Sequence, residues 1–310
     1  MKKTLFLLAT VAILISSCKK DNSTTKPSAK KYNVTFNVTN FSTKQSAFAL
    51  KRHTGPSSAD ALPSLNSYFD VLYYLVYDQN ANLVSRQQQD STMSNMGTIT
   101  DALPAGNYHV SIIAGKNGLF IEDPNYYGGD DYGYGGNPWQ DTFFSSFFIT
   151  VGSDNISQGV TLTREVGKLE VKLLDNIPAN AAYLTISTSQ EAYGLDIWQG
   201  FYFYGPVGSV SFPVAIPDSA KGKPNFTIDR LIANTNPING LPINIVCTAA
   251  DNSVIASITV QNVYCYANQK TIVSGDLFSS IAGPTQSFTA VVDTAWSSGV
   301  TQVGFSLKHH

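Results

Sequence analysis

Apolar and polar side chains alternate along most of the chain, and this period of two is the feature that most restricts the fold. In residues 32–39, 69–77 and 169–173, apolar residues occupy every second position, which places them on one face of an extended strand. No stretch has the pattern of a capped amphipathic helix of three turns. Further alternating runs are separated by Gly, Pro, Asn and Asp: residues 108–112, 184–186, 210–212, 226–228, 243–247, 258–260 and 288–292. The sequence therefore predicts an all-β chain built from antiparallel β-sandwiches.

Two halves of similar length are predicted. Val166 and Gly167 separate two alternating runs, so we expect an N-terminal β-sandwich over residues 32–165 and a C-terminal β-sandwich over residues 166–310. Each is of ordinary domain length. A weak repeat agrees with a duplication, because Leu103-Pro104 and Leu241-Pro242 each precede an alternating strand that ends in a polar turn.

The first residues have the pattern of a bacterial lipoprotein signal peptide. Two lysines precede the apolar run 5–15, which is shorter than the roughly 20 apolar residues that span a bilayer. An aliphatic residue, two serines and Cys18 follow, as in a lipobox. We expect residues 1–17 to be a signal peptide, Cys18 to carry a covalent lipid, and residues 18–31 to form the lipidated cysteine with a flexible tether. The alternative is an ordinary secretory signal with an incidental cysteine.

One long segment, residues 122–141, differs from the rest in composition. It combines glycines and acidic residues with no Lys or Arg, and its aromatic residues are Tyr126, Tyr127, Tyr132, Tyr134 and Trp139. One interpretation is a contact surface for a glycan or a protein partner, because aromatic rings stack on flat ligands and anchor interfaces. Loops of this length inside compact domains are more often functional than idle.

Two other interpretations of the same segment stay open. Asp123, Asp130 and Asp131 are a weak candidate for calcium, since clustered carboxylates suit a hard cation, but their spacing does not match an EF-hand loop. A long surface insertion without any ligand is the other interpretation.

Cys247 and Cys265 remain once Cys18 is assigned to the lipid. In an oxidising cell envelope they could form a disulfide. Both lie in strand-like runs, so two buried free thiols are an equal alternative.

Several functional classes are disfavoured by what the sequence lacks. The net charge of −2 and the pI of about 6.1 give no broad attraction to nucleic acid. Three Cys and four His form no zinc-binding array. A Gly-x-Ser-x-Gly elbow, a His-Glu-x-x-His motif and a Walker loop are absent from the sequence. We therefore predict a non-enzymatic protein whose sole cofactor is the lipid, with no metal and no nucleic-acid partner.

A family resemblance rests on three motifs that follow the lipobox in order. They are the strand 71–77 with its turn at Asp78 and Asn80, the segment 103–110 (LPAGNYHV), and the segment 162–171 (LTREVGKLEV). This succession resembles the fimbrillin-associated anchor lipoproteins of Bacteroidetes. In that family an Arg-x-x-Gly-Lys segment, matched here by Arg164, Gly167 and Lys168, joins two Greek-key, transthyretin-like β-sandwiches.

The resemblance implies a function that composition and spacing do not show. It implies a lipid-anchored protein of the outer membrane and cell surface that anchors or caps a fimbria. Its partners would be fimbrial subunits, which would contact it by β-augmentation. The alternative function is that of a surface glycan-binding lipoprotein that uses residues 122–141.

Overall fold

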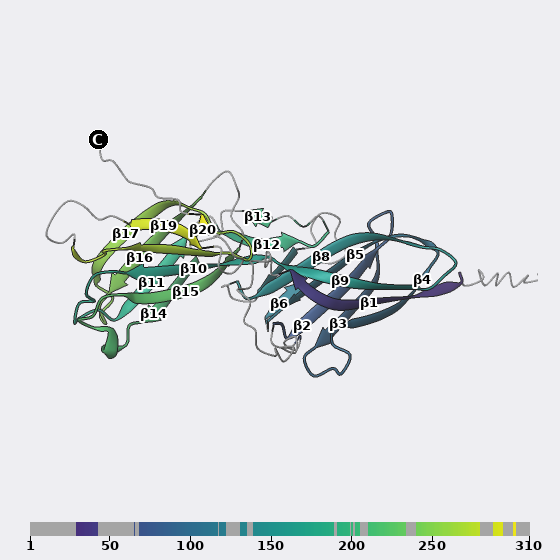
Figure 1. Ribbon diagram of the computed structural model, residues 1–310, viewed down its shortest axis with the longest axis horizontal. Helices are drawn as coiled ribbons and strands as arrows, with labels where there is room; N and C mark the ends of the chain where they lie inside the picture. The colour runs from purple at the N-terminus through teal and green to yellow at the C-terminus, as the bar shows by residue number, and fades with distance from the viewer. Residues whose placement is uncertain are drawn as a thin grey trace, which may run out of the picture.

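The computed structural model describes residues 29–42, 65, 68–116, 118–121, 131–134, 139–188, 191–198, 200, 202–204, 210–233, 240–279, 288–293 and 300–301. Figure 1 shows two β-rich halves placed end to end along the long axis of the molecule. The predicted signal peptide and Cys18 lie outside the described residues. Among the residues that are described, no helix has the length and the hydropathy needed to cross a bilayer.

The N-terminal half contains a seven-stranded sheet with the order β3-β2-β5-β8-β9-β1-β4. Its strands are β1 (Lys31–Ser42), β2 (Val71–Tyr77), β3 (Leu83–Asp90), β4 (Thr98–Pro104), β5 (Gly106–Gly115), β8 (Thr142–Val151) and β9 (Ile156–Arg164). Strands β8 and β9 are paired only at Phe143–Arg164 and Phe144–Thr163. The sheet therefore separates into two layers, β3-β2-β5-β8 and β9-β1-β4, that face each other across a core.

The core of this half follows the predicted alternation. Val34, Phe36 and Val38 of β1 are buried, and the residues between them face outward. They pack with the inward faces of the other strands, including Leu72, Tyr74, Val76, Ile99, Val110, Ile112, Phe143, Val160 and Leu162. Burying a large apolar side chain of this kind stabilises the fold by about 2 kcal/mol, so these alternating positions specify both layers.

The turn between β2 and β3 confirms the predicted hairpin. The Asp78 Oδ1 atom accepts hydrogen bonds from the backbone N–H groups of Asn80 at 2.8 Å and Asn82 at 2.9 Å. Ala81 between them has a positive φ of 61°, and the side-chain bonds of Asp78 hold the backbone in this tight turn.

The C-terminal half is a sandwich of two separate sheets. A five-stranded sheet has the order β15-β10-β18-β19-β20, and a four-stranded sheet has the order β14-β11-β16-β17. The elements are β10 (Val166–Leu173), β11 (Tyr183–Thr188), β14 (Val210–Ala215), the 3₁₀ turn η2 (Asp218–Ala220), β15 (Phe226–Ala233), β16 (Leu241–Thr248), β17 (Val254–Val263), β18 (Lys270–Gly275), β19 (Phe288–Asp293) and β20 (Val300–Thr301). A second apolar core fills the space between these sheets.

The two halves repeat one topology. In each, the first strand lies between an antiparallel and a parallel neighbour: β1 lies between β4 and β9, and β10 lies between β15 and β18. The layer β3-β2-β5-β8 corresponds in order to β14-β11-β16-β17. Leu103-Pro104 ends β4 directly before β5, and Leu241-Pro242 begins β16, the strand that corresponds to β5. The weak sequence repeat thus coincides with a repeat of strand order.

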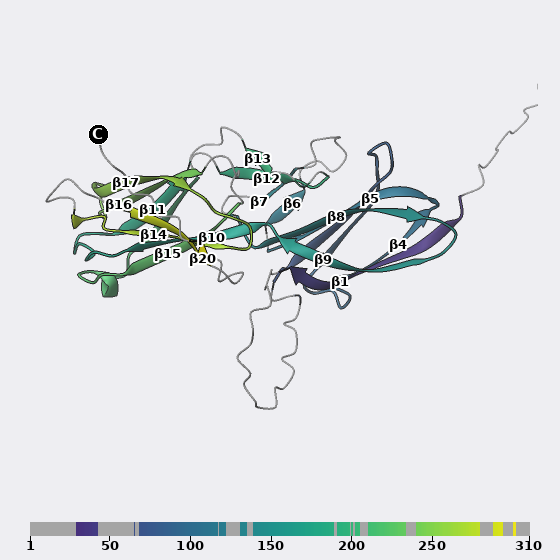
Figure 2. The same cartoon turned by 45° about the horizontal axis from the view of Figure 1, so that its top comes forward.

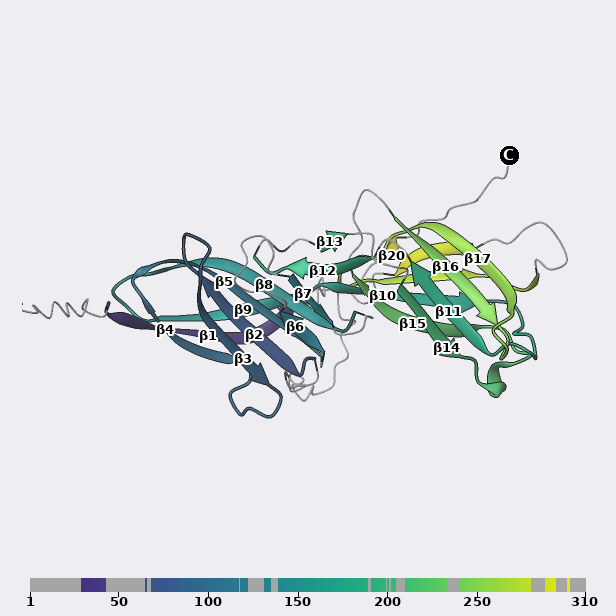
Figure 3. The ribbon, with the colours of Figure 1, turned by 180° about the vertical axis from the view of Figure 1, so that it is seen from behind.

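Two inserted hairpins interrupt this repeat and meet each other. Strands β6 (Leu119–Ile121) and β7 (Asp131–Tyr134) lie between β5 and β8, whereas β12 (Ala192–Asp196) and β13 (Tyr202–Tyr204) lie between β11 and β14. Together they form a four-stranded sheet with the order β13-β12-β7-β6. Figures 2 and 3 show this composite sheet in the region where the two halves meet. One sheet therefore contains strands from both halves.

The start of β10 allows a direct test of how closely this strand packs against the turn between β17 and β18. A Cβ atom on Gly167 would lie 2.5 Å from the Tyr266 carbonyl oxygen, whereas a Cβ atom on Gly152 would meet nothing within 4 Å. Because backbone cannot move aside cheaply, Gly167→Ala should lower the free energy of unfolding by about 2 kcal/mol. Gly152→Ala, the matched control, should change it by less than about 0.5 kcal/mol. Urea unfolding of both variants measures the difference, and equal midpoints would contradict the close packing at Gly167.

Candidate functional site: the junction of the two halves

The unusual segment 122–141 contributes a strand to the composite sheet. Backbone pairs join Tyr132 of β7 to Ile121 of β6 on one side and to Leu195 of β12 on the other. Tyr132, Tyr134 and Asp131 therefore have their backbone in β7. Tyr126, Tyr127, Asp123 and Asp130 lie outside the described residues. Part of a segment that one interpretation treated as a surface insertion is thus a point of contact between the halves.

Trp139, one of the aromatic residues considered for contact with a glycan or a partner, is an internal residue. Its side chain is 4% exposed. The indole Nε1–H donates a hydrogen bond to the Ala192 carbonyl oxygen at 2.8 Å, and the Tyr202 ring lies 6.2 Å away between centroids. Both of these partners belong to the hairpin β12–β13, so the indole fastens the inserted segment of one half to the hairpin of the other.

A third apolar core surrounds Trp139. All seven residues of β2 are buried, because this core covers the face of β2 that points away from the N-terminal core. Its members come from both halves: Val71, Tyr73, Leu75, Tyr77, Ile113, Leu119, Ile121, Trp139, Phe144, Val166, Ala192, Leu195, Ile197 and Ala233. The halves are therefore joined by a continuous apolar interior as well as by strand pairing.

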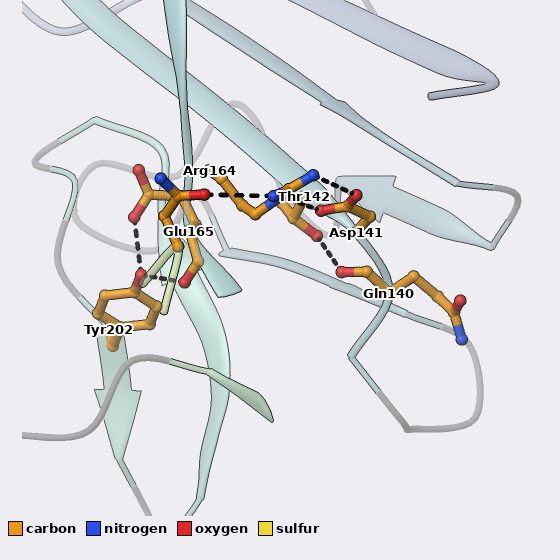
Figure 4. A network of polar contacts seen from close by, with 7 residues as sticks. Gln140, Asp141, Thr142, Arg164, Glu165 and Tyr202 are labelled. Atoms are coloured by element: carbon orange, nitrogen blue, oxygen red, sulfur yellow. Dashed lines mark hydrogen bonds and ion pairs between the residues drawn. The ribbon is translucent and has the colours of Figure 1, made fainter. Parts of the chain in front are cut away.

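Arg164, at the end of β9, holds a polar network beside this core (Figure 4). Its Nε and Nη2 atoms donate to the two carboxylate oxygens of Asp141, at 2.7 and 3.0 Å. Its Nη1 atom donates to the Asn268 Oδ1 atom at 3.2 Å, and the guanidinium lies over the Phe143 ring at 5.0 Å. A bidentate pair of this geometry fixes orientation, so Arg164 orients a residue of each half.

Glu165 is the single residue between β9 and β10. Its N–H donates to the Thr142 carbonyl oxygen at 2.8 Å. The Tyr202 hydroxyl lies 2.7 Å from both the carbonyl oxygen and the Oε2 atom of Glu165 (Figure 4). Burial raises the pKa of the Glu165 carboxyl from 4.5 to about 7, and the hydrogen bond from Tyr202 opposes this rise only in part.

A buried ion pair lies at the base of the hairpin β12–β13. Arg230 of β15 donates to the carboxylate of Glu191, which precedes β12. The Ala233 N–H donates to the other carboxylate oxygen at 3.4 Å. Burial raises the pKa of the Glu191 carboxyl, and the Arg230 charge opposes that rise. Removing one partner would leave an uncompensated buried charge. The pair therefore holds the start of the hairpin β12–β13 against β15 of the C-terminal sandwich.

Cys247 and Cys265 are both buried thiols that form no disulfide, which is the second of the two alternatives that the sequence left open. Burial raises the pKa of the Cys247 thiol to about 11 and that of the Cys265 thiol to about 12. A protonated thiol in the core is a poor nucleophile, so both residues act as small apolar side chains.

The described part of the chain contains no group of three His, Cys, Asp or Glu side chains that could hold a metal ion. The calcium hypothesis depends mainly on Asp123 and Asp130, which lie outside it. The hypothesis stays untested.

The two layers of the N-terminal sandwich are bridged by hydrogen bonds along one side, between β3 and β4, and are open along the other side, between β8 and β9. On the bridged side, Gln87 and Gln89 of β3 donate from Nε2 to the β4 carbonyls of Thr100 and Thr98, at 3.0 and 2.8 Å. On the open side, residues 145–151 of β8 and 156–162 of β9 have no partner strand on their facing edges among the described residues. Unpaired edges of this kind are sites where another strand can add.

The C-terminal half shows what fills the equivalent edge. Strand β18 corresponds to β9, and all six of its residues pair with β19. The architecture therefore accepts an additional antiparallel strand at this position.

Comparisons with known proteins identify a shared fold. No family model matches the sequence, and no curated protein matches it. A Bacteroides thetaiotaomicron protein described as a "putative adhesin" aligns with a TM-score of 0.52 at 11% identity, over 89% of this chain and 99% of that chain. Proteins of the same species described as "putative polysaccharide binding proteins" align with a TM-score of 0.53 at 10% identity, over 88% and 98%. The fimbrial anchor protein Mfa2 from Porphyromonas gingivalis aligns with a TM-score of 0.49 at 12% identity, over 84% and 96%.

The raised pKa of Glu165 predicts a pH-dependent junction. The pKa of the Glu165 carboxyl is about 7 in the folded state, against an ordinary value of 4.5. Its contribution to the free energy of unfolding is therefore fully present below pH 4.5 and is lost as the pH rises through about 7. Between about pH 5 and about pH 8, the free energy of unfolding should fall by about 1–2 kcal/mol more in the native chain than in Glu165→Gln.

Asp154→Asn, an exposed turn position, is the control and should keep the native pH dependence. Denaturant unfolding across this pH range measures the effect. A native pH dependence in Glu165→Gln would show that another group is responsible.

Proposed function

We propose that this protein is a cell-surface adhesion protein of the fimbrillin-associated type, held in the outer membrane by a lipid on Cys18. The observation that carries the proposal is the two-sandwich fold, which matches the Bacteroides "putative adhesin" along almost the whole length of both chains. The lipobox at residues 15–18 and the segment Arg164, Gly167 and Lys168 support it from the sequence.

The proposed partner is a fimbrial subunit that contributes a strand. The unpaired edges of β8 and β9 offer main-chain hydrogen-bonding groups, and β19 fills the corresponding edge in the other half. Strand addition uses the backbone for affinity, which explains why no side-chain motif in the sequence marks the site.

The junction holds the two halves in one fixed arrangement. A filament strand at the open edge of β8 and β9 would lie in the N-terminal half, the same half that continues into the proposed tether at residues 18–31. The shared core, the hydrogen bond from Arg164 to Asn268 and the composite sheet resist bending at Glu165. Every described feature of the junction is explained by this structural role, so the proposal assigns the protein no catalytic activity.

Deleting the gene should release fimbriae from cells or change their length, as seen by electron microscopy and by immunoblots of fimbrial subunits in the medium. A chain with Cys18→Ser should leave the membrane fraction and should not restore attachment, because its anchor is missing. Unchanged filaments in the deletion strain would contradict the proposal, and so would full rescue by Cys18→Ser.

The strand edge can be tested separately by placing a photo-crosslinking amino acid at Gln158, an exposed position on the open edge of β9. Ser219 in η2, exposed on the other half, is the matched control position. The fimbrial subunit should be captured from Gln158 and not from Ser219. Equal capture from both positions would rule out the edge as the specific contact.

A further inference from the structure

An aromatic shelf lies on the outer face of the N-terminal sheet, where β2, β5 and β8 run side by side. We define it as Tyr77, His109, Phe148 and Trp198. Tyr77 is paired with His109 across β2 and β5, and His109 with Phe148 across β5 and β8. The His109 ring lies 4.7 Å from the Phe148 ring and 4.3 Å from the Trp198 ring between centroids. The row crosses three strands. Tyr77 and His109 are buried within it, so Phe148 and the half-buried Trp198 form its accessible part.

Phe148 is presented to solvent rather than used by the core. Its side chain is 78% exposed, whereas the preceding Phe147 packs against the N-terminal core and meets Phe36 at 5.5 Å between ring centroids. Folding gains little from an aromatic ring held in water. Phe148 therefore offers the face of an aromatic ring to a ligand, beside the buried His109 ring that supports it.

The shelf is held in place by the loop that follows β12. Ser111 donates from Oγ to the Ile197 carbonyl oxygen at 2.5 Å. The Asp196 Oδ1 atom accepts a hydrogen bond from the backbone N–H of Trp198 at 2.8 Å. The Tyr77 ring meets the Trp198 ring edge-on, at 4.9 Å between centroids. Because these bonds fix Trp198 in the unbound protein, a ligand would not have to order it.

Neutral polar groups border Phe148 on the same face. Asn107 and Thr150 are register partners in the neighbouring row, and the Thr150 hydroxyl donates to the Asn107 Oδ1 atom at 2.7 Å. Both side chains are exposed, so the Asn107 amide N–H groups and the Thr150 oxygen remain available to a ligand. Ser146 lies on the other side of Phe148 along β8.

His109 adds an unused polar atom beneath the ring. Its side chain is 4% exposed, and its Nδ1 atom has no hydrogen-bond partner among the described residues. Burial lowers the pKa of His109, and the nearby Asp196 charge opposes this. The imidazole is therefore neutral at neutral pH and adds no charge to the shelf.

We propose that the shelf binds the pyranose rings of a neutral carbohydrate. An apolar ring face flanked by exposed amide and hydroxyl groups matches the apolar face and the peripheral hydroxyls of a sugar. A charged ligand would find no opposite charge on Phe148, Asn107, Thr150 or Ser146. The site does not include residues 122–141. It uses side chains on the outer face of β5 and β8, whereas a fimbrial strand would pair with the backbone of residues 145–151 of β8, so the two ligands would lie next to each other.

The test is binding of the purified chain to neutral hexasaccharides of glucose, galactose, mannose and N-acetylglucosamine, measured by calorimetry and affinity electrophoresis. At least one should bind, and Phe148→Ala should weaken it by at least about tenfold, because stacking on the ring is lost. Phe148→Tyr should retain binding. Val84→Ala, which removes another exposed apolar side chain (46% exposed), should leave it unchanged.

Circular dichroism and unfolding midpoints confirm that the exposed substitutions leave the fold intact. Binding that survives Phe148→Ala would overturn the proposal. An absence of binding to all four hexasaccharides would also overturn it, and loss of fimbrial attachment in Phe148→Ala would then assign Phe148 to contact with a protein strand. Failure of fimbrial attachment without any change in sugar binding would count against the proposed function alone.

Discussion

The pairing of β12 with β7 is the constraint on which the rest of the molecule depends, because it places strands from both halves in one sheet. The outer face of β2 is as apolar as its inner face and would be exposed without a cover. Apolar residues of both halves pack against this outer face. The hydrogen bond from the Trp139 indole to the Ala192 carbonyl oxygen joins the two groups of residues. A relative rotation of the halves would expose this core.

Polar groups near the junction are consistent with a fixed geometry. Arg164 and Glu165 lie where the chain passes between the halves, and their bonds reach Asp141, Asn268 and Tyr202. Charges withdrawn from water are stable only when they are paired or neutralised. Arg164 is paired, and the Glu165 carboxyl gains protons more readily than usual. Moving the halves apart would cost both the apolar contacts and these polar ones.

The two sandwiches could be predicted from the sequence because most of their strands alternate apolar and polar side chains, which places one face in the core and the other in solvent. Strands β1, β10 and β16 were predicted in this way and were confirmed. Strand β5 was also predicted, but residues 108–115 of it are buried on both faces. Strands β6, β7, β12 and β13 were not predicted, because each has only three to five residues, too few to establish a period of two. Their pairing depends on a strand from the other half, which local sequence cannot show.

The site residues were predictable to a smaller extent. Trp139 stands in a Gly-rich acidic segment that looks solvent-exposed, and only the three-dimensional structure shows it to be internal. The ion pair of Glu191 and Arg230 joins residues 39 positions apart, and the sequence carries no signal for it. Arg164 was singled out by the family resemblance, although its bond to Asp141 was not.

The shared sheet and core should hold the two halves as one rigid body, and the distance between positions on opposite halves reports on this rigidity. Spin labels at Thr100 and Thr227, which are exposed on opposite halves, would be compared with a pair at Thr227 and Ser257 within the C-terminal half. The internal cysteines are buried and would stay unlabelled. Pulsed electron spin resonance should give a distance distribution across the junction as narrow as that of the internal pair. A broad or multiple distribution across the junction alone would show that the halves move independently, and would contradict the account.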